Sequence, residues 1–220
     1  MTLLGIATQG ARGSLAIGRF QGSSLHDMHQ IGWDKKAMHS ELATVKLQEL
    51  LAQASVSLAE ISQVAVVVGP GSFTGIRVGV NLARTLAYGL GAQVATFNTL
   101  EVLAFKNLAP GEKGLLAIKA LREFHYNAAY ERSTKGLLEL LPIEASSETH
   151  CMARQKPGYK FLIEDKSPGF STDIEASDLL KYLDLWPTSK SFMIWENVKP
   201  LYIRGSEAEE KLKLGLLKPV

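Results

Sequence analysis

The stretch that decides the fold is VAVVVGPGSFTGIRVGVNLARTLAYGLG, which runs from Val64 to Gly91. Its first five residues are all apolar, which is typical of a short strand buried on both faces. A turn rich in glycine follows, and residues 74–88 then repeat apolar side chains at helical spacing. Gly89 or Gly91 is placed to end this helix. The stretch therefore predicts a strand, a glycine-rich turn and a helix.

Units of this kind often bind phosphate, so the turn can be compared with two phosphate-binding motifs. A P-loop requires a lysine and a Ser or Thr directly after its last glycine, whereas Gly75 is followed by Ile76 and Arg77. The dinucleotide fingerprint requires a third glycine where Thr74 stands. The turn therefore matches neither motif.

Two roles stay open for the residues at the start of this helix. Gly71, Ser72 and Thr74 could bind an anion or a nucleotide phosphate through backbone N–H groups. Ser72 and Thr74 could equally be plain N-caps. The cap is the favoured interpretation.

Small residues form a ridge along the same helix. They recur every four residues and therefore share one face. Glycine inside a helix costs about 0.5–1 kcal/mol relative to alanine, so the ridge indicates that another backbone approaches closely. Either the chain's own sheet or first helix covers the ridge, or a helix of another chain does. The ridge consists of Gly71, Gly75, Gly79, Ala83 and Ala87.

Two arginines of this helix, Arg77 and Arg84, lie seven residues apart and share another face. A solvated face is the favoured interpretation. The alternative is polar contact with a partner or with the phosphates of a nucleotide.

Composition narrows the class of protein. The chain has 220 residues, a net charge of +2 and no run of Lys or Arg, which disfavours a dedicated nucleic-acid binder. A single cysteine, Cys151, excludes an intrachain disulfide and fits a reducing compartment. The sequence shows neither a signal peptide nor an apolar run long enough to span a bilayer. We therefore expect a soluble, cytoplasmic protein.

The elements of the first half predict a mixed sheet covered by helices. Three strands with short connections form a meander, and α/β crossovers follow. We expect strands at residues 3–8, 14–20 and 25–31, a helix over 39–54 with Ser40 as its N-cap, strands at 64–68 and 93–97, and a helix from Asn98 or Thr99 to residue 108.

The second half resembles a shortened copy of the first. Pro110 and Gly111 mark a boundary between an N-terminal lobe of residues 1–108 and a smaller C-terminal lobe and tail of residues 109–220. Residues 146–153 are ambiguous. We expect strands at 115–119, 125–131, 136–141 and 159–164, a helix at 173–183, a strand or extended segment at 199–205 and a short helix at 206–214.

Four segments together point to a known family. GPGSFTGIRVGVNLARTLAYGL resembles the glycine-rich motif of the TsaB (YeaZ) family, a branch of the actin, sugar-kinase and Hsp70 ATPase superfamily. HSELATVKLQELLAQASVSLAEI resembles its first helix and the segment after it, FNTLEVLA its helix after the fifth strand, and VKPLYIR its closing Pro-x-Tyr-x-Arg pattern. The resemblance covers residues 1–108 well and the second half weakly. It implies an actin-like, ribonuclease H-like α/β fold with two lobes, the second reduced.

The resemblance also implies a function. TsaB proteins help to make threonylcarbamoyladenosine beside the anticodon of tRNAs without being the catalyst. They pair with the metal- and nucleotide-binding paralogue TsaD, and the ATPase TsaE joins the complex. On this basis we expect no intrinsic cofactor, an ATP or ADP at most at the partner interface, and contact with tRNA only through the complex. The free chain could also form a homodimer.

In that family the contact with TsaD uses helices of the first lobe, which correspond here to residues 39–54 and 74–88. The resemblance therefore places a partner interface on these two helices. Its expected residues are His39, Leu42, Val45, Lys46, Glu49, Gly75, Ile76, Arg77, Gly79, Leu82, Ala83 and Leu86.

The sequence departs from the family at two places. The first strand of the family ends in Asp-Thr-Ser, where this chain has Ala7-Thr8-Gln9. The motif of its second lobe begins with aspartate, where this chain has Lys119. In the wider superfamily the first aspartate positions a metal–nucleotide complex, and alanine cannot do so. Both changes disfavour independent ATP hydrolysis.

Other chemistry has little support in the sequence. His26 and His29 lie three apart on an expected strand and point to opposite faces, so we expect no metal site. Ser72 lacks the Gly-x-Ser-x-Gly elbow, and the adjacency of His150 to Cys151 does not create a catalytic pair. We therefore expect no catalytic residue. The alternative function is a stand-alone nucleotide-binding ATPase of this superfamily, or a peptidase-like relative.

Overall fold

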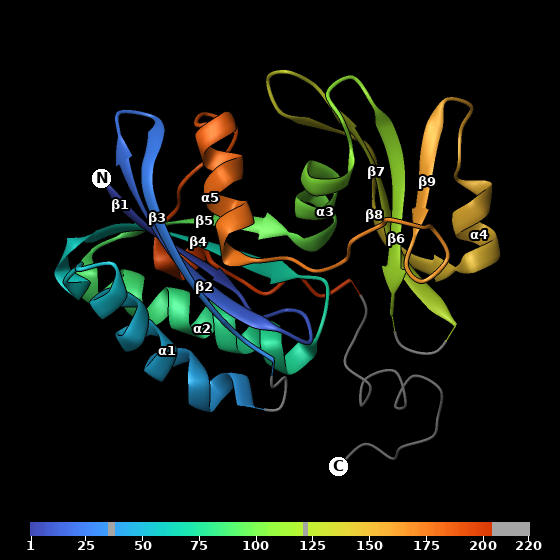
Figure 1. Cartoon of the computed structure of the whole chain (residues 1–220). Coiled ribbons are helices and arrows are strands. Elements are labelled where there is room, and N and C mark those ends of the chain that lie inside the picture. The colour runs from blue at the N-terminus through green and yellow to red at the C-terminus, as the bar shows by residue number, and fades with distance from the viewer. Residues whose placement is uncertain (35–37, 121–122, 204–220) are drawn as a thin grey trace, which may run out of the picture.

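The computed structural model describes residues 1–34, 38–120 and 123–203. Its first half forms one five-stranded sheet with the strand order β3-β2-β1-β4-β5 (Figure 1). β1, β2 and β3 pair antiparallel, whereas β4 and β5 run parallel to β1. The predicted mixed sheet is therefore confirmed. The strands are β1 (Thr2–Ala7), β2 (Gly13–Gln21), β3 (Ser24–Trp33), β4 (Ile61–Gly69) and β5 (Gln93–Asn98).

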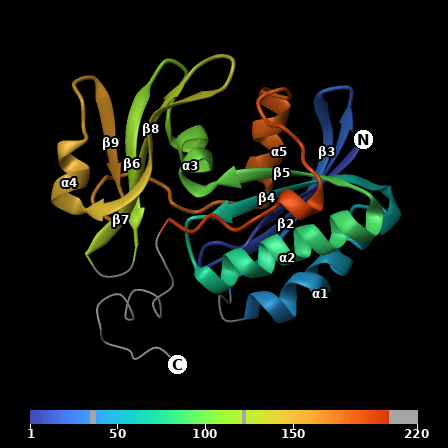
Figure 2. The ribbon, with the colours of Figure 1, turned by 180° about the vertical axis from the view of Figure 1, so that it is seen from behind.

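Helices cover both faces of this sheet. α1 (His39–Gln53) and α2 (Phe73–Leu90) lie side by side on one face, and α3 (Thr99–Asn107) and α5 (Ala176–Leu185) lie on the other (Figures 1 and 2). A short 3-10 helix, η2 (Leu58–Glu60), leads from α1 into β4. The sheet is thus the middle layer of three, which explains why β4 is apolar on both of its faces.

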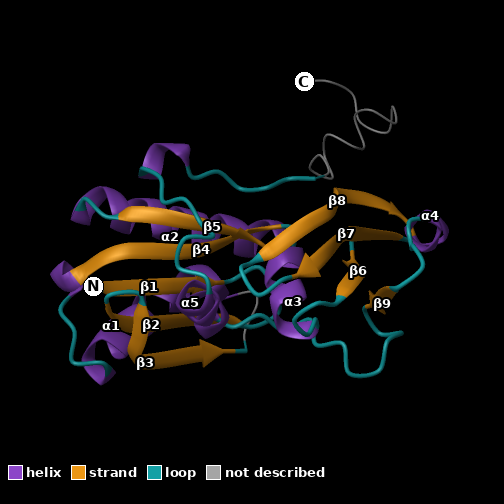
Figure 3. Ribbon diagram, turned by 90° about the horizontal axis from the view of Figure 1, so that it is seen from above, coloured by secondary structure: helices purple, strands orange, loops and turns teal. Residues whose placement is uncertain are grey.

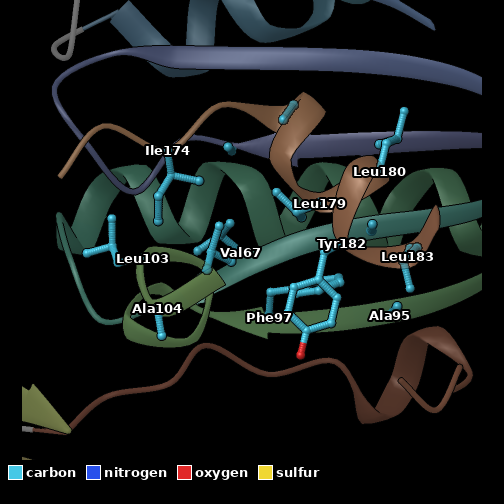
Figure 4. Close-up of a cluster of buried hydrophobic side chains, with 14 of the residues drawn as sticks. Val67, Ala95, Phe97, Leu103, Ala104, Ile174, Leu179, Leu180, Tyr182 and Leu183 are labelled. Atoms are coloured by element: carbon cyan, nitrogen blue, oxygen red, sulfur yellow. The ribbon is translucent and has the colours of Figure 1, made fainter. Parts of the chain in front are cut away.

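Each face of the sheet has its own core. On the α3 and α5 side, Val67 and Phe97 of the sheet pack against Leu179 and Tyr182 of α5 (Figure 4). On the α1 and α2 side, the alternate residues of the same strands, such as Val66, pack against Val80 of α2 and the rest of the second cluster. Because successive side chains of a strand point to opposite faces of the sheet, each strand contributes to two separate apolar layers.

The second half forms a smaller sheet with the order β8-β7-β6-β9, which lies beside the first (Figure 3). α3 packs against β6 and β7, and α4 packs against β7 and β8. The ambiguous residues 146–153 are the end of β8 followed by α4. The elements are β6 (Lys113–Lys119), β7 (Phe124–Arg132), β8 (Leu137–Ser147), α4 (Glu148–Ala153) and β9 (Tyr159–Ile163).

α5 belongs to the second half of the chain but packs on the first sheet. The hydroxyl of Ser14 accepts a hydrogen bond from the backbone N–H of Ala176 at 2.8 Å. At the other side of the helix, the Tyr182 hydroxyl donates to Glu101 of α3 at 2.9 Å, and Lys190 forms an ion pair with the same carboxylate at 2.6 Å. The boundary between residues 108 and 109 stays a prediction, and α5 is the element that crosses it.

The helix ends follow local chemistry, with one exception. Asn98 caps α3 in a capping box with Glu101, and Gly91 ends α2 with a φ of 65°. Ser40 was predicted as the N-cap of α1, and this is wrong. α1 begins at His39, so Ser40 already lies inside its first turn.

The chain returns to the first sheet as a segment that we call the C-terminal strap, residues 193–203. Met193 bridges Val94 of β5, and the 3-10 helix η3 (Trp195–Asn197) then lies beside α2 (Figure 2). The segment predicted at 199–205 as a strand or extended forms no strand up to residue 203. Its remainder and the helix predicted at 206–214 lie outside the described residues.

Candidate partner-binding surface

The small-residue ridge of α2 faces the chain's own first strand. A Cβ atom on Gly75 would lie 2.0 Å from the backbone oxygen of Thr8, and one on Gly79 would lie 2.5 Å from the Thr8 hydroxyl oxygen. Only a residue without a Cβ atom lets α2 approach the end of β1 this closely. Ala83 and Ala87 continue the ridge and are fully buried. The interpretation in which the ridge packs on its own sheet is therefore correct.

The same geometry corrects part of the expected partner interface. Gly75, Ile76, Gly79 and Ala83 are buried between α2 and the sheet. Another chain cannot touch them while α2 keeps this position. Their placement at a partner surface is therefore wrong, and any contact must use the outer side of the helix.

The glycine-rich turn is fixed to the residues after β1. The backbone N–H of Ser72 donates to the carbonyl of Gln9 at 2.8 Å, and a Cβ atom on Gly71 would lie 2.6 Å from that same oxygen. The Ser72 hydroxyl accepts from the N–H of Gly75 at 3.3 Å, which confirms Ser72 as an N-cap. An anion at Gly71, Ser72 and Thr74 stays a prediction.

His39 was also expected at the partner surface, and this is wrong because the side chain is buried. The Trp33 indole N–H donates to His39 Nδ1 at 2.8 Å. Since the indole can only donate, Nδ1 accepts, and Nε2 is the atom left to donate to the Gly10 carbonyl at 3.3 Å. His39 therefore fixes the start of α1 to the β1–β2 turn.

The other α1 residues that were expected at the partner interface lie on the outer side of this helix. Val45 is 48% exposed, and Leu42 is half-buried one turn before it. Lys46 and Glu49 form an ion pair at 2.6 Å along the helix. Exposed pairs of this kind add little to stability, so they mainly give this side of α1 a mixed charge.

On α2 the expected residues Leu82 and Leu86 are half-buried and pack at the rim of the core that α1 and α2 share. They follow Gly75 by seven and eleven residues, so they lie at the edge of the buried ridge, between the inner and the outer side of the helix. A Cβ atom on Gly75 would lie 3.4 Å from the His39 ring, so this edge is the one nearest α1. We call the joint outer face the α1–α2 surface. It consists of Leu42, Val45, Lys46, Glu49, Leu82 and Leu86.

Arg77 and Arg84 lie on the other side of α2, toward the C-terminal strap. The guanidinium carbon of Arg77 lies 4.0 Å from the Phe73 ring centroid, and its Nε donates to the Tyr202 hydroxyl at 2.9 Å. The guanidinium of Arg84 lies over the Trp195 ring at 5.5 Å. Neither arginine is simply solvated, because each contacts an aromatic side chain of the strap. The pairing of the strap with α2 was not predicted.

The two departures from the family pattern have different surroundings. Ala7 is buried in the core between the sheet, α3 and α5. Lys119 lies on the surface at the end of β6, where it forms an ion pair with Asp165 and its backbone N–H donates to Glu164 at 2.6 Å. The hydrogen bond to Asp165 raises the pKa of Lys119, so its positive charge is stabilised at neutral pH.

The one cysteine of the chain, Cys151, is buried. Burial raises the pKa of the Cys151 thiol to about 11, which keeps it protonated at neutral pH. Within the described ranges, no three His, Cys, Asp or Glu side chains gather so that they could hold a metal ion. In the same part of the chain, every helix is too short or too polar to cross a membrane.

The fold defines a class of protein. A five-stranded mixed sheet of order 3-2-1-4-5, helices on both faces and a smaller second sheet give the chain an actin-like α/β fold. Among solved structures, YeaZ from Pseudomonas aeruginosa has this fold, with a TM-score of 0.75 and 19% identity over 92% of this chain and 100% of that one. A second Pseudomonas aeruginosa structure, titled as an uncharacterised protein similar to peptidase YEAZ, gives a TM-score of 0.74 at the same identity, over 92% of this chain and 99% of its own.

Sequence comparison narrows the class to a family. A family model described as tRNA N6-adenosine threonylcarbamoyltransferase (TsaD) matches residues 35–162, which is more than half of the chain. The chain belongs to this family, on its TsaB/YeaZ branch.

Curated relatives carry the name tRNA threonylcarbamoyladenosine biosynthesis protein TsaB. The Buchnera aphidicola protein from Acyrthosiphon pisum is 22% identical over 79% of this chain and 76% of its own length. The Escherichia coli protein is 34% identical over 45% of this chain and 44% of its own. The Bacillus subtilis protein is 39% identical over 31% of this chain and 30% of its own. The last two matches thus span less than half of those proteins.

Proposed function

We propose that the chain is a non-catalytic scaffold subunit of the complex that forms threonylcarbamoyladenosine in tRNA, and that it dimerises with a TsaD-like paralogue. Its curated relatives are named for this biosynthesis. The observation that carries the dimerisation is the α1–α2 surface, where the half-exposed Val45 and three half-buried leucines lie on two adjacent helices.

The shape and composition of this surface suit a helical partner. The side chains on the surface of a helix form ridges and grooves, into which those of another helix can pack. Leu42, Val45, Leu82 and Leu86 would form the apolar centre of the contact, and the Lys46–Glu49 pair would lie at its polar rim. A paralogue with the same fold would present an equivalent pair of helices, so the two chains could associate about a pseudo-two-fold axis.

The surroundings of three residues support a non-catalytic scaffold role. Ala7 stands where the family resemblance places the superfamily's metal-side aspartate, and it is part of the core. The Ser72 hydroxyl is engaged as an N-cap. The Cys151 thiol is buried, and its raised pKa disfavours the thiolate that a nucleophile requires.

The test is Val45→Glu in an association experiment with the genome-encoded TsaD-like protein. A charge in the apolar centre should weaken the association at least ten-fold, roughly 1.4 kcal/mol. Reconstituted tRNA modification should fall in parallel. The free variant should keep its circular dichroism spectrum and melting temperature, because Val45 is half exposed and makes few core contacts.

Gln53→Glu is the matched control. It places the same charge on the same helix, eight residues and roughly 12 Å further along, where Gln53 is exposed. Its association with the partner should equal that of the wild type. If Val45→Glu associates as tightly as the wild type, the α1–α2 surface is not the interface.

A TsaE-like ATPase and tRNA would join through the assembled complex, and a nucleotide would bind at most at the partner interface. The alternative, a stand-alone ATPase, requires ATP affinity in the purified chain, which isothermal titration measures. Light scattering with and without the TsaD-like protein separates a homodimer of the free chain from the heterodimer.

A further inference from the structure

The closing Pro-x-Tyr pattern of the sequence, Pro200 to Tyr202, lies against the start of α2. The backbone N–H of Leu201 donates to the carbonyl of Val68 at 2.8 Å, which fixes the strap to the end of β4. The Tyr202 ring stacks on Phe73, with centroids 5.2 Å apart and planes inclined by 30°. The strap therefore holds an aromatic side chain in one orientation beside the first turn of the helix.

Arg77 completes this cluster. Its guanidinium lies over the Phe73 ring at 4.0 Å and beside the Tyr202 ring at 6.0 Å, and its Nε donates to the Tyr202 hydroxyl at 2.9 Å. These contacts fix both the position and the plane of the guanidinium. Among the described residues, only Tyr202 accepts a hydrogen bond from it. The two Nη groups form a planar fork of donors, which matches a carboxylate or a phosphate.

The cluster is exposed although it is ordered by its own contacts. Phe73 is 41% exposed and Tyr202 43%, and Arg77 is exposed as well. Arg and Tyr are residue types that dominate binding energy at protein interfaces. Groups that are held in place before binding lose less conformational entropy when a partner arrives.

Resting on the proposed function, we propose that Tyr202 is a positioning residue that pre-organises Arg77 to bind a carboxylate of the TsaD-like partner. Charge favours a carboxylate over a tRNA phosphate. The chain has a net charge of only +2 and no run of Lys or Arg, whereas phosphate-binding surfaces collect several cations. Arg84, two turns further along α2, adds no free cation here, since it stacks on Trp195 and its Nε is buried.

The test is a double-mutant cycle of Arg77→Ala and Tyr202→Phe, measured as the dissociation constant of the complex with the TsaD-like protein. Tyr202→Phe keeps the ring stack and removes only the hydroxyl that accepts from Arg77. It should weaken the association about five-fold. Arg77→Ala should weaken it about 20-fold, and the double variant no further, because Tyr202 acts through Arg77.

Tyr88→Phe is the matched control. It removes a tyrosine hydroxyl from the same helix, and the Tyr88 ring contacts Trp195 at the far end of α2. Its association and the melting temperatures of all the free variants should equal those of the wild type. A purely structural role of Tyr202 would lower the melting temperature and leave the association unchanged.

Three outcomes would overturn the inference. Tyr202→Phe could associate as tightly as the wild type, the two substitutions could weaken association independently, or only tRNA binding by the complex could fall. Val45→Glu separates the two proposals in the same assay. If it abolishes association while the Arg77 and Tyr202 variants bind normally, the proposed function stands and this inference fails. If the wild-type chain does not bind the TsaD-like protein, the proposed function itself fails.

Discussion

The two sides of helix α2 differ in how they contact the rest of the chain. On the inner side, Gly75 and Gly79 contribute no side chain, and the helix backbone lies directly on the end of β1. On the outer side, Phe73 and Arg77 extend to the strap, where they contact Tyr202. The inner side is fixed by backbone contacts that tolerate no added atom, whereas the outer side is fixed by side chains that remain partly exposed.

This difference shows which residues of a glycine-rich motif are available for binding. Gly75 and Gly79 are not available for binding, because each faces a backbone or hydroxyl oxygen of Thr8 where α2 closely approaches β1. The large side chains of the same helix are left for the α1–α2 surface and for the strap. Substitutions of the inner glycines should therefore lower stability, whereas substitutions of exposed side chains on the outer side should mainly affect association.

The largest effect should follow from Gly75→Ala on the inner side. The added Cβ atom would lie 2.0 Å from the Thr8 carbonyl oxygen, which belongs to the backbone and cannot rotate away. α2 would have to shift from the sheet, so we expect a loss of about 3 kcal/mol or more in the free energy of unfolding. Urea unfolding followed by circular dichroism measures it. A stability equal to that of the wild type would show that α2 does not lie this close to β1.

Removal of a strap contact should have the next largest effect. Trp195→Ala deletes a half-buried ring that contacts Tyr88 and Arg84, and we expect it to lower the free energy of unfolding by about 2 kcal/mol. Glu196→Ala changes the next residue of the strap, which is exposed, and should stay within about 0.5 kcal/mol of the wild type. Equal stabilities for both variants would mean that the strap does not hold the outer side of α2.

The order of elements in the first half could be predicted because its signals are local. The apolar run at 64–68 and the helical period at 74–88 correspond to β4 and α2, which are longer by a few residues. The helical period also identified the ridge of small residues on α2, because the period determines which residues share one face of the helix. It could not identify what covers the ridge, since Thr8 comes from a segment 67 residues from Gly75.

The features that were not predicted depend on contacts between different segments of the chain, or on a residue that belongs to two elements. The contact of Arg77 with Tyr202 joins residues 125 positions apart, so no local pattern signals it. His39 has the sequence context of a helix start, and only the nearby Trp33 indole shows that it is buried. Residues 146–153 were ambiguous because Ser147 both ends β8 and caps α4.

A smaller effect on the inner side should follow from Thr8→Val. The Thr8 hydroxyl is buried and donates to the Gly75 carbonyl at 2.7 Å. Replacing the hydroxyl by a methyl group should lower the free energy of unfolding by about 1 kcal/mol. Thr85→Val makes the same change at an exposed position of α2 and should have no measurable effect. If chemical denaturation gives equal stabilities for the two variants, the hydroxyl does not help to hold α2 on β1.

The smallest effect, and one of opposite sign, should follow from Gly89→Ala. Gly89 lies in the last turn of α2, and a Cβ atom there would meet nothing within 4 Å. Alanine should therefore raise the free energy of unfolding by about 0.5 kcal/mol, because it reduces the freedom of the unfolded chain. Gly91→Ala is its counterpart. The φ of 65° at Gly91 is unfavourable for alanine and should make that variant about 1 kcal/mol less stable. Thermal unfolding of the two variants, compared with Gly75→Ala, would rank three glycines of one stretch by what surrounds them. If Gly89→Ala were as destabilising as Gly75→Ala, conformational preference and not the contact with β1 would explain the glycines of α2.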